Sequence, residues 1–433
     1  MLSGRCEELF SIFPTYRTSP SLAVDSDPAA RRPIPLRHLA HPAEPSAAQA
    51  KVRVTIDFLE AYPMSTAGPV RTVGTDVPDT MQAVICHGPE NYVMEEVPVP
   101  TVGPGEALVK VEAVGICASD LKCYHGAAKF WGDANRPAWA ETEVIPGHEF
   151  VGTVVQLDDE AAGRWGVSVG DRVTSEQIVP CWTCRYCVRG QYHMCGPHDI
   201  YGFKRRTPGA MASYMIYPSD ALVHKISADL PPAHAAFVEP LSCALHAVER
   251  ANLTFDDVVV VAGCGPIGLG MIAGARAKYP AKVVALDMAP DKLKLALECG
   301  ADIAINIGEE DAITAVKDMT GGYGADVYLE GTGHPSAVAQ GLNILRKLGT
   351  YVEYSVFGSD VSVDWSIISD DKELDVLGAH LGPHTWPAAV RMLESRILPM
   401  DKICSHQLPL SEFQKGLDLV ASGKESVKVS LIP

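Results

Sequence analysis

Two patterns of apolar and polar residues divide the chain. From Met81 to about residue 240, short segments such as MQAVICHG and EALVKVEAVGIC alternate apolar and polar positions between prolines and glycines. A period of two residues predicts half-buried β-strands. Beyond residue 240, apolar runs such as VVVVAG and KVVALD alternate with helical patterns such as PIGLGMIAGARAKYP and DKLKLALECG, the latter ending at Gly300. This alternation predicts an α/β region with a parallel sheet, to which DIAINI, DVYLEGTG and TYVEYSV add later strands.

Both ends of the chain differ from these regions. Residues 1–80 are rich in Pro, Ala and Arg and show little periodicity. They predict a disordered extension, or else a mis-assigned start with translation beginning at Met64 or Met81. Acidic residues such as Glu7 and Glu8 argue against a transit peptide. From about residue 380 the pattern returns to a mixed character.

Length and charge narrow the class of protein. A chain of 433 residues predicts two sizeable cores. Its net charge of −17 disfavours a nucleic-acid partner, which needs a basic surface. The chain has neither an apolar run long enough to span a membrane nor a secretory signal, so we expect no membrane partner and a cytoplasmic location.

A cluster of cysteines carries the strongest chemical signal. Of twelve cysteines, four follow the spacing Cys181-x2-Cys184-x2-Cys187-x7-Cys195. Four thiolates at this spacing can wrap one metal ion tetrahedrally and leave no open position for chemistry. Zinc and an iron–sulfur centre both suit a sulfur shell, and a tight loop among strands favours structural zinc. The cluster also favours a reducing compartment.

A second group of residues fits an open metal site. His148 and Glu149 stand side by side in GHEFVG, Cys117 lies upstream, and Glu239 lies downstream in VEP. A catalytic zinc needs about three protein ligands and one exchangeable position. Cys117, His148 and Glu149 can supply these ligands, while Glu239 is either a fourth ligand or acts through the zinc-bound water or the substrate.

Two residues that follow Cys117 are candidates to assist the metal site. Asp120 suits acceptance of a hydrogen bond from the His148 ring, which would fix its tautomer. Ser119 is a candidate to hydrogen-bond the reacting alcohol and pass its proton outward. The structural alternative for both is capping of a helix or a loop.

A glycine motif predicts a dinucleotide site. G-x-G-x-x-G follows the strand VVVVAG and opens a helix, which is the context that a pyrophosphate-binding loop requires. Asp287 ends the next strand and is expected to bind the ribose hydroxyls, so that NAD is favoured over NADP. The expected cofactor-binding residues are Gly263, Gly265, Pro266, Ile267, Gly268 and Asp287.

Together these elements resemble the zinc-containing medium-chain alcohol dehydrogenase family, in its polyol (sorbitol dehydrogenase-like) branch. The motifs that carry the resemblance are GICASD, GHEFVGTVV, VGDRV, CWTCRYC with Cys195, FVEPLS and AGCGPIGLG. The resemblance implies a discontinuous GroES-like β-barrel catalytic domain over 81–240 and 380–433. It also implies a Rossmann NAD-binding domain over 241–379, and an active site in the cleft between them.

Some positions depart from sorbitol dehydrogenase. Cys123 stands where that enzyme has a substrate-contacting Tyr, and Leu381 and Gly382 replace an Arg-Tyr pair. The stretch AAKFWGDANRPAWAETEVIP is longer than usual and brings Phe130, Trp131 and Trp139, which are candidates to wall the substrate pocket or to pack elsewhere. The stretch from CASDLKCYHG through this insertion looks most like erythritol/L-threitol dehydrogenases.

The resulting hypothesis is a zinc-dependent oxidoreductase with NAD+ as the hydride acceptor. It would hold two zinc ions per chain and oxidise a secondary hydroxyl of erythritol or L-threitol to give erythrulose. By resemblance we expect a homo-oligomer, with a tetramer favoured. The rival substrates are other polyols, such as xylitol and sorbitol, and L-threonine. A rival of another class is a non-catalytic NADH-binding sensor or structural relative.

Overall fold

The structure is a computed structural model that describes residues 71–72 and 77–433. Most of the extension predicted over 1–80 lies outside the described residues. Within it, Arg71–Thr72 form strand β1, which pairs with Leu157 and Gln156, so regular structure begins before Met81. In the described part of the chain, no helix is long and apolar enough to cross a membrane.

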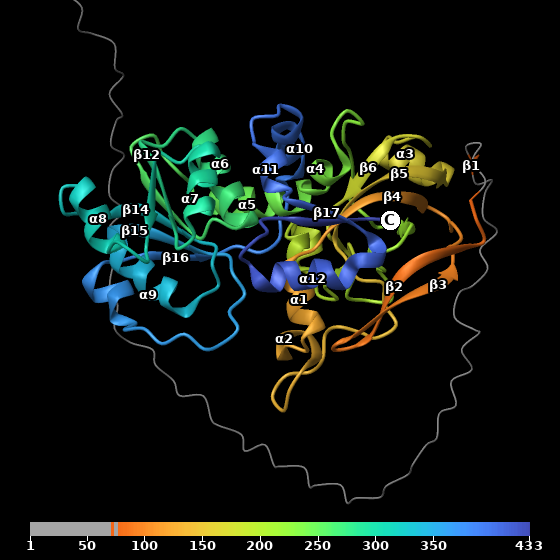
Figure 1. Cartoon of the computed structure of the whole chain (residues 1–433), viewed down its shortest axis with the longest axis horizontal. Coiled ribbons are helices and arrows are strands. Elements are labelled where there is room, and N and C mark those ends of the chain that lie inside the picture. Colours follow the sequence, from red (N-terminus) through yellow and green to blue (C-terminus); the bar gives the residue numbers. More distant parts are fainter. Residues whose placement is uncertain (1–70, 73–76) are drawn as a thin grey trace, which may run out of the picture. The chain divides into compact units, whose positions relative to one another are not determined.

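The first large sheet combines strands from the first region with two strands from the C-terminal tail. Its order is β10-β6-β5-β4-β18-β17, with β1 added on β5 and β9 added on β4 (Figure 1). The strands are β4 Ala107–Gly115, β5 Glu149–Leu157, β6 Arg172–Ser175, β9 Tyr214–Tyr217, β10 Val223–Lys225, β17 His406–Pro409 and β18 Val429–Ile432. Because β18 pairs with β4, the tail completes the sheet that the first region begins.

Smaller elements surround this sheet. The hairpin of β2 and β3 and the short pair of β7 and β8 are antiparallel. These elements are β2 Thr80–Gly88, β3 Asn91–Pro98, β7 Ile178–Val179, β8 Asp199–Ile200, and the helices α1 Ala118–Tyr124, α2 Ala128–Trp131, α3 Asp159–Trp165 and α4 Pro232–Ala236. Helices α1 to α4 are absent from the prediction, because segments of four to seven residues are too short to show a helical period.

The second large sheet has six parallel strands in the order β13-β12-β11-β14-β15-β16. Its strands are β11 Val258–Ala262, β12 Lys282–Asp287, β13 Ile303–Asn306, β14 Ala325–Glu330, β15 Leu345–Glu353 and β16 Asp375–Gly378. The strand order reverses at β11, which lies between β12 and β14. In such sheets, ligands bind beyond the carboxyl ends of the strands at this point of reversal.

Helices cover both faces of the parallel sheet (Figure 1). Alternate residues of β11 point to opposite sides: Val259 and Val261 pack with α5, α6 and α7, whereas Val260 and Ala262 pack with α8 and α9. The helices are α5 Val238–Ala251, α6 Pro266–Ala277, α7 Pro290–Glu298, α8 Ala312–Met319 and α9 Pro335–Ile344, followed by α10 Trp386–Glu394, α11 Met400–Ile403 and α12 Phe413–Ser422. This arrangement is the Rossmann-type α/β fold predicted from the sequence.

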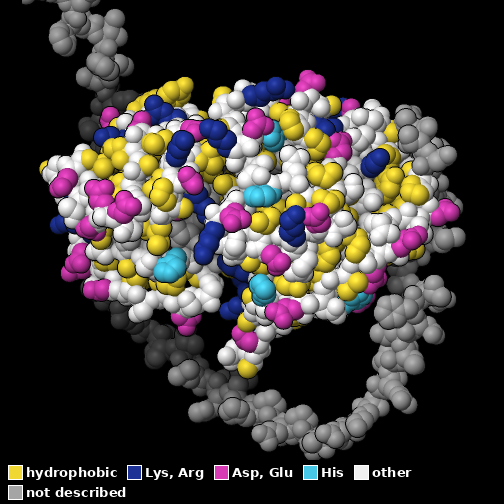
Figure 2. Space-filling model, viewed as in Figure 1, with side chains coloured by type: hydrophobic (Ala, Val, Ile, Leu, Met, Phe, Trp, Pro, Cys, Tyr) yellow, Lys and Arg dark blue, Asp and Glu magenta, His cyan; other side chains and the backbone are white. Residues whose placement is uncertain are grey.

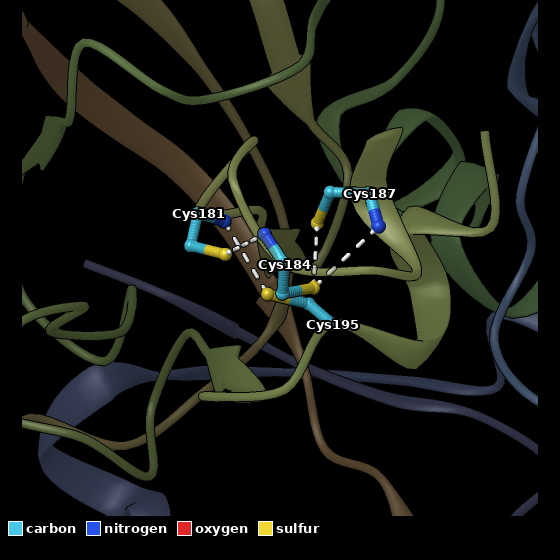
Figure 3. A group of neighbouring side chains, drawn as sticks. All are labelled: Cys181, Cys184, Cys187 and Cys195. Atoms are coloured by element: carbon cyan, nitrogen blue, oxygen red, sulfur yellow. Dashed lines mark hydrogen bonds between the residues drawn. The ribbon is translucent and has the colours of Figure 1, made fainter. Parts of the chain in front are cut away.

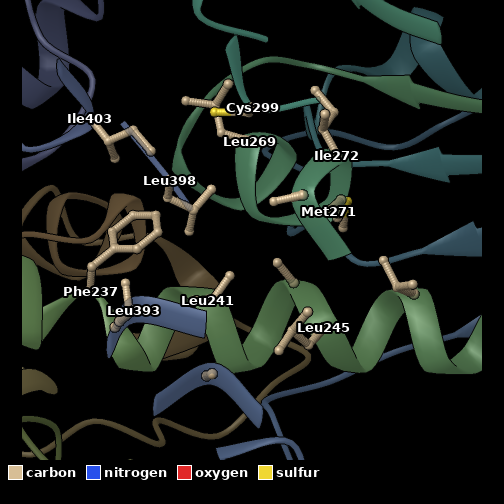
Figure 4. Packing of buried hydrophobic residues seen from close by; sticks show 14 of the residues in the cluster. Phe237, Leu241, Leu245, Leu269, Met271, Ile272, Cys299, Leu393, Leu398 and Ile403 are labelled. Atoms are coloured by element: carbon tan, nitrogen blue, oxygen red, sulfur yellow. The ribbon is translucent and has the colours of Figure 1, made fainter. Parts of the chain in front are cut away.

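Helix α5 links the two regions through its packing. Its Leu241 and Leu245 join the buried cluster that also holds Leu269 and Ile272 of α6 and Leu393 of α10 (Figure 4). Each side chain of this kind, when fully buried, contributes about 1.5–3 kcal/mol to folding. The helix runs through the position between residues 240 and 241, where the sequence suggested a domain boundary. That division therefore falls inside a continuous helix.

Charged side chains of both signs lie on the surface (Figure 2). On the face drawn in Figure 2, acidic and basic side chains are interspersed among apolar ones. The formal net charge is −17, so no excess of basic groups is available to neutralise a phosphate backbone.

Candidate active site

The four clustered cysteines converge in one lobe. Their sulfur atoms all lie within 4.8 Å of one another (Figure 3). The lobe is built from loops and single helical turns between β7 and β8, and the tight cysteine spacing brings the thiols to one point. The residues are Cys181, Cys184, Cys187 and Cys195.

Backbone and hydroxyl groups donate to these sulfurs. The N–H groups of Cys184 and Cys181 approach Cys181 Sγ and Cys195 Sγ, each at 3.3 Å. Hydrogen bonds from the Thr183 side chain and from backbone N–H groups lower the pKa of Cys181 to about 6. Donors of this kind stabilise thiolates, which are the form that binds zinc. The lobe therefore fits a closed tetrathiolate metal site.

A second group of metal-binding atoms comes from separate elements. The ligand atoms of Cys117, His148 and Glu149 lie within 4.8 Å of one another. Cys117 caps the N-terminus of α1, Glu149 is the first residue of β5, and His148 directly precedes that strand. His148 and Glu149 are 6% and 1% exposed, so the loss of water around the carboxylate requires a compensating charge. A thiolate, an imidazole and a carboxylate form a donor set that suits zinc.

Asp120 orients both the cysteine and the histidine. Its Oδ2 accepts a hydrogen bond from the backbone N–H of Cys117 at 2.8 Å, and its Oδ1 lies 3.2 Å from His148 Nδ1. Nδ1 is therefore directed to the carboxylate, which leaves Nε2 for the metal. Ser119 Oγ lies 3.4 Å from His148 Nε2, the ring nitrogen that faces away from Asp120.

A buried lysine lies against Glu149. Lys428, which directly precedes β18, pairs with Glu149 Oε2 and donates to the backbone oxygen of Ile116 at 3.0 Å. Both charged side chains are buried. Gly115 makes the pairing possible, because a Cβ there would lie 2.1 Å from Glu149 Oε2. The sequence analysis missed Lys428, since no local motif connects it with Glu149.

Glu239 lies in the first turn of α5, outside the group of three. Gln177 Nε2 donates to its Oε1 at 2.6 Å, and Cys243 Sγ lies 3.4 Å from the same oxygen. Burial, and then the nearby Glu149, raise the pKa of Glu239 to about 7. Tyr354, which follows β15, hydrogen-bonds to Cys243. This polar network joins α5 to the end of the parallel sheet.

The glycine loop follows β11 and opens α6. Gly263 has φ +88°, which a residue with a side chain rarely adopts. A Cβ at Gly265 would meet no atom within 4 Å, whereas one at Gly268 would lie 1.7 Å from Gly263 O. Pro266 occupies the first turn of α6, where its missing N–H costs nothing. The backbone of Gly263 thus lies close to Gly268, and open space remains beside Gly265.

Asp287 stands at the carboxyl end of β12 and faces this loop. Its Oδ2 accepts a hydrogen bond from Cys264 N at 2.7 Å, and its Oδ1 accepts bonds from Met288 N and Ala289 N at 2.7 and 2.9 Å. The carboxylate is therefore held in place next to the glycine loop. The side chain of Met288 is 68% exposed and brings no positive charge.

One cation bridges the helix of Cys117 and the loop that follows β15. Lys122 of α1 donates to the backbone oxygen of Val356 at 2.5 Å. Burial lowers the pKa of Lys122, and the negative charges of Cys117 and then Glu330 oppose this change. The helix that Cys117 caps and the loop at the carboxyl end of the parallel sheet therefore lie against each other.

Aromatic side chains pack beside His148. The ring of Phe203 lies 5.4 Å from the His148 ring, and Trp139 lies 5.2 Å from Phe203 between ring centroids. Phe130 stacks on Phe203 at 5.4 Å. Trp131 instead donates through Nε1 to Cys123 O, at 2.7 Å. The sequence analysis named the three residues of the long insertion but missed Phe203, which reaches them only in the fold.

Sequence models and relatives agree on the family. The alcohol dehydrogenase GroES-like domain matches residues 103–228, and the zinc-binding dehydrogenase domain matches residues 266–395. The chain is 78% identical over 361 residues to the erythritol/L-threitol dehydrogenase of Mycolicibacterium smegmatis, covering 83% of this chain and 100% of that one. It belongs to the zinc-binding alcohol dehydrogenase family. The predicted fold class and family resemblance are thereby confirmed, and the chain is an oxidoreductase.

More distant relatives share the whole architecture. Identity to the sorbitol dehydrogenase of Halalkalibacterium halodurans is 34% over 352 residues, covering 80% of this chain and 97% of that one. The crystal structure of a zinc-binding dehydrogenase from Sinorhizobium meliloti 1021, bound to NADP, superposes with a TM-score of 0.73 at 28% identity. The match covers 82% of this chain and all of that one.

The structure shows the surroundings of the residues at which this chain departs from sorbitol dehydrogenase. Cys123 is 3% exposed and packs in the aromatic cluster with Phe130 and Phe203. Leu381 packs against the same cluster. At Gly382, a Cβ would lie 2.4 Å from Ser242 Oγ, so this backbone leaves no room for a tyrosine. Leu381 therefore adds an apolar side chain to this cluster, where the expected pair would bring an arginine.

Proposed function

We propose that this dehydrogenase oxidises a secondary hydroxyl of a small polyol, with erythritol or L-threitol as substrate, erythrulose as product and NAD+ as hydride acceptor. The observation that carries the proposal is the 78% identity to an erythritol/L-threitol dehydrogenase over that protein's full length. We propose the relative's substrate for this chain because the residues that could hold the reacting groups are present and lie close together.

Cys117, His148 and Glu149 are the proposed protein ligands of the catalytic zinc. Their donor atoms lie close enough to share one ion. Three protein ligands would leave the fourth position of a four-coordinate zinc to a substrate hydroxyl. When bound, zinc acts as a Lewis acid that lowers the pKa of the hydroxyl. Glu239 is assigned an indirect role, since Gln177 already occupies its Oε1. The four-cysteine lobe is the proposed structural zinc site.

The glycine loop and Asp287 are the proposed NAD site. The loop of Gly263, Gly265, Pro266, Ile267 and Gly268 leads into the N-terminus of α6, whose free backbone N–H groups would face the pyrophosphate. Pro266 has no N–H and would contribute by fixing the first turn of the helix. Asp287 would accept hydrogen bonds from the ribose hydroxyls and repel a 2′-phosphate, which supports NAD over the NADP bound by the Sinorhizobium relative.

The chain's own residues prepare the proton and hydride transfers. Asp120 holds His148 in one tautomer and so keeps Nε2 directed away from it. Ser119 would take up the hydroxyl proton and pass its own outward, a role that its distance of 3.4 Å from His148 Nε2 supports. Glu239 orients a neighbouring hydroxyl or a water molecule. The apolar wall of Phe130 and Phe203 limits access of water.

The proposal extends to the domains, the assembly and the location of the protein. We propose a catalytic domain over 81–240 and 380–433, and a nucleotide-binding domain over 241–379. A homotetramer in the cytoplasm is the proposed assembly and location, in keeping with the family resemblance. Neither assignment alters the chemistry above.

A substrate panel with both cofactors tests the proposal. Initial rates on erythritol, D- and L-threitol, xylitol, sorbitol and L-threonine should be highest for a four-carbon polyol with NAD+. Preference for L-threonine would overturn the proposed substrate. Absence of turnover on every compound would favour the rival hypothesis of a non-catalytic NADH-binding relative. Metal analysis should find about two zinc ions per chain.

A further inference from the structure

Lys122 ties the helix of a proposed metal ligand to a distant loop. Cys117 caps the N-terminus of α1, and Lys122 lies in the last turn of the same helix. Its Nζ donates to the backbone oxygen of Val356, which lies 234 positions farther along the chain, at 2.5 Å. Hydrogen bonds from a charged donor are among the stronger ones in proteins. The contact therefore constrains how closely α1 and the loop after β15 approach each other.

Other contacts hold the loop of Val356 against the nucleotide-binding region. Tyr354 hydrogen-bonds to Cys243 of α5. A Cβ at Gly333, in the loop after β14, would lie 3.2 Å from Val356 O, so the two loops pack closely. Lys122 approaches the same oxygen from α1. The loop after β15 is thus gripped between the parallel sheet and the helix that Cys117 caps.

The order of the strands relates this loop to the proposed NAD site. Asp287, proposed to bind the adenosine ribose, ends β12, and the glycine loop proposed for the pyrophosphate follows β11. The sheet continues in the order β12-β11-β14-β15, with neighbouring strands about 4.8 Å apart. A dinucleotide that runs along the carboxyl ends of these strands therefore directs its nicotinamide past β11, toward β14 and β15. Lys122 contacts the loop on this side of the sheet.

We propose that Lys122 is a positioning residue that holds the loop of Val356 against α1 and so sets the distance between the nicotinamide and the metal site of Cys117. This role rests on the proposed function, specifically on its NAD and zinc sites, and not on the identity of the polyol. A displacement of reacting groups by about 1 Å can lower a rate by about 100-fold. Loss of the Lys122 contact should therefore slow hydride transfer more than it weakens binding of the polyol.

The test compares Lys122→Met, which removes the donor, with Lys122→Arg, which keeps a cationic donor. Lys372→Met is the matched control, because Lys372 also donates to backbone oxygens, those of Leu342 and Leu345, each at 2.6 Å. Leu345 begins β15, so this contact lies at the opposite end of the strand from Val356. In Lys122→Met, kcat with NAD+ should fall about 10–100-fold while KM for the polyol changes little. Lys122→Arg should recover most of the lost rate, and Lys372→Met should keep kcat.

Calorimetric titrations with NADH and ADP-ribose separate this role from a general structural one. ADP-ribose keeps the adenosine and pyrophosphate groups assigned to Asp287 and the glycine loop, and it lacks the nicotinamide. In Lys122→Met, Kd for NADH should rise about 3–10-fold, as expected for one lost hydrogen bond, while Kd for ADP-ribose should be unchanged.

The outcomes distinguish this role from the proposed substrate. An unchanged kcat in Lys122→Met, or the same effect on the Kd values of NADH and ADP-ribose, overturns the positioning role. Lys122→Gln provides a second removal of the charge if Lys122→Met does not fold. A wild-type enzyme that oxidises none of the polyols, while Lys122→Met still weakens NADH alone, overturns the proposed substrate and supports the role of Lys122 at the nicotinamide.

Discussion

Asp120 Oδ1 lies 3.2 Å from His148 Nδ1, and both side chains are buried. Neither atom has another hydrogen-bond partner in the described part of the chain. The pair therefore fixes the orientation of the imidazole before any metal binds, and the same carboxylate fixes the backbone of Cys117. Two of the three proposed ligands thus depend on one aspartate.

Asp120→Asn should weaken the catalytic zinc without affecting the structural one. The amide cannot stabilise the imidazole in the same way, and loss of such a partner typically lowers metal affinity by about 10–100-fold. Zinc content measured after dialysis against a weak chelator should fall from two ions per chain to about one. Asp318→Asn, at an exposed position of α8, is the control and should keep both ions. Retention of both zincs in Asp120→Asn would contradict the positioning role.

Cys117→Ser should abolish turnover while leaving the four-cysteine lobe loaded. A hydroxyl is a poorer zinc ligand than a thiolate, so kcat should fall by at least about 100-fold, beyond what a lost second-sphere contact causes. Cys404→Ser changes a buried cysteine outside both groups and should keep activity. The assay is the initial rate with NAD+ together with zinc content. Substantial activity in Cys117→Ser would remove Cys117 from the catalytic site.

The sequence allowed prediction of features that depend on local spacing. The strand VVVVAG with its glycine loop predicted β11 and the start of α6, because a buried parallel strand is a continuous apolar run. The four-cysteine spacing likewise predicted the converging thiols. Asp120 was recognisable because it lies within one helical turn of Cys117.

Features that depend on contacts between distant segments were not predictable. Lys428 meets Glu149 only because β18 returns to pair with β4, and Gln177 meets Glu239 only where β7 passes α5. Phe203 joins Trp139 through the packing of a loop onto the long insertion. A single sequence carries no periodic signal for such pairs. The helices α1 and α2 were missed for a different reason, since both are shorter than two helical turns.

Lys428→Met should destabilise the protein far more than removal of a surface lysine. It leaves the Glu149 carboxylate buried without its cation, and such changes typically cost about 3–5 kcal/mol. Lys402→Met breaks the exposed pair with Glu298 and should cost at most about 1 kcal/mol. The free energy of unfolding in urea measures both. Equal costs for the two variants would show that the buried pair adds nothing beyond a surface one.

Glu353→Gln should flatten the loss of stability toward alkaline pH. Glu353 is paired in register with Glu330 at the ends of β15 and β14, and burial, followed by the Glu330 charge, raises the pKa of Glu353 to about 8. Between the unfolded pKa of about 4.3 and 8, the folded state holds a proton that the unfolded state lacks, so unfolding becomes easier as pH rises. Its contribution is complete below that window and lost above it.

Melting temperatures between pH 5 and 9 measure this effect. The wild type should lose stability as pH rises toward 8, and Glu353→Gln should lose less, because the amide cannot ionise. Glu310→Gln, at an exposed position, is the control and should follow the wild type. A wild-type slope that persists in Glu353→Gln would assign the effect to other groups.

Asp287→Ala should weaken NAD binding and relax discrimination against NADP. The substitution removes the acceptor for the ribose hydroxyls and the negative charge that repels a 2′-phosphate. It also releases Cys264 N, and with it the glycine loop, so the KM for NAD+ should rise by about 10-fold or more from the loss of charge-assisted hydrogen bonds. Asp287→Asn, which can still accept from Cys264 N, separates the two effects: it should keep more NAD affinity but lose the discrimination. The ratio of kcat/KM for NAD+ to that for NADP+ is the deciding quantity, and a ratio unchanged in both variants would exclude Asp287 from cofactor selection.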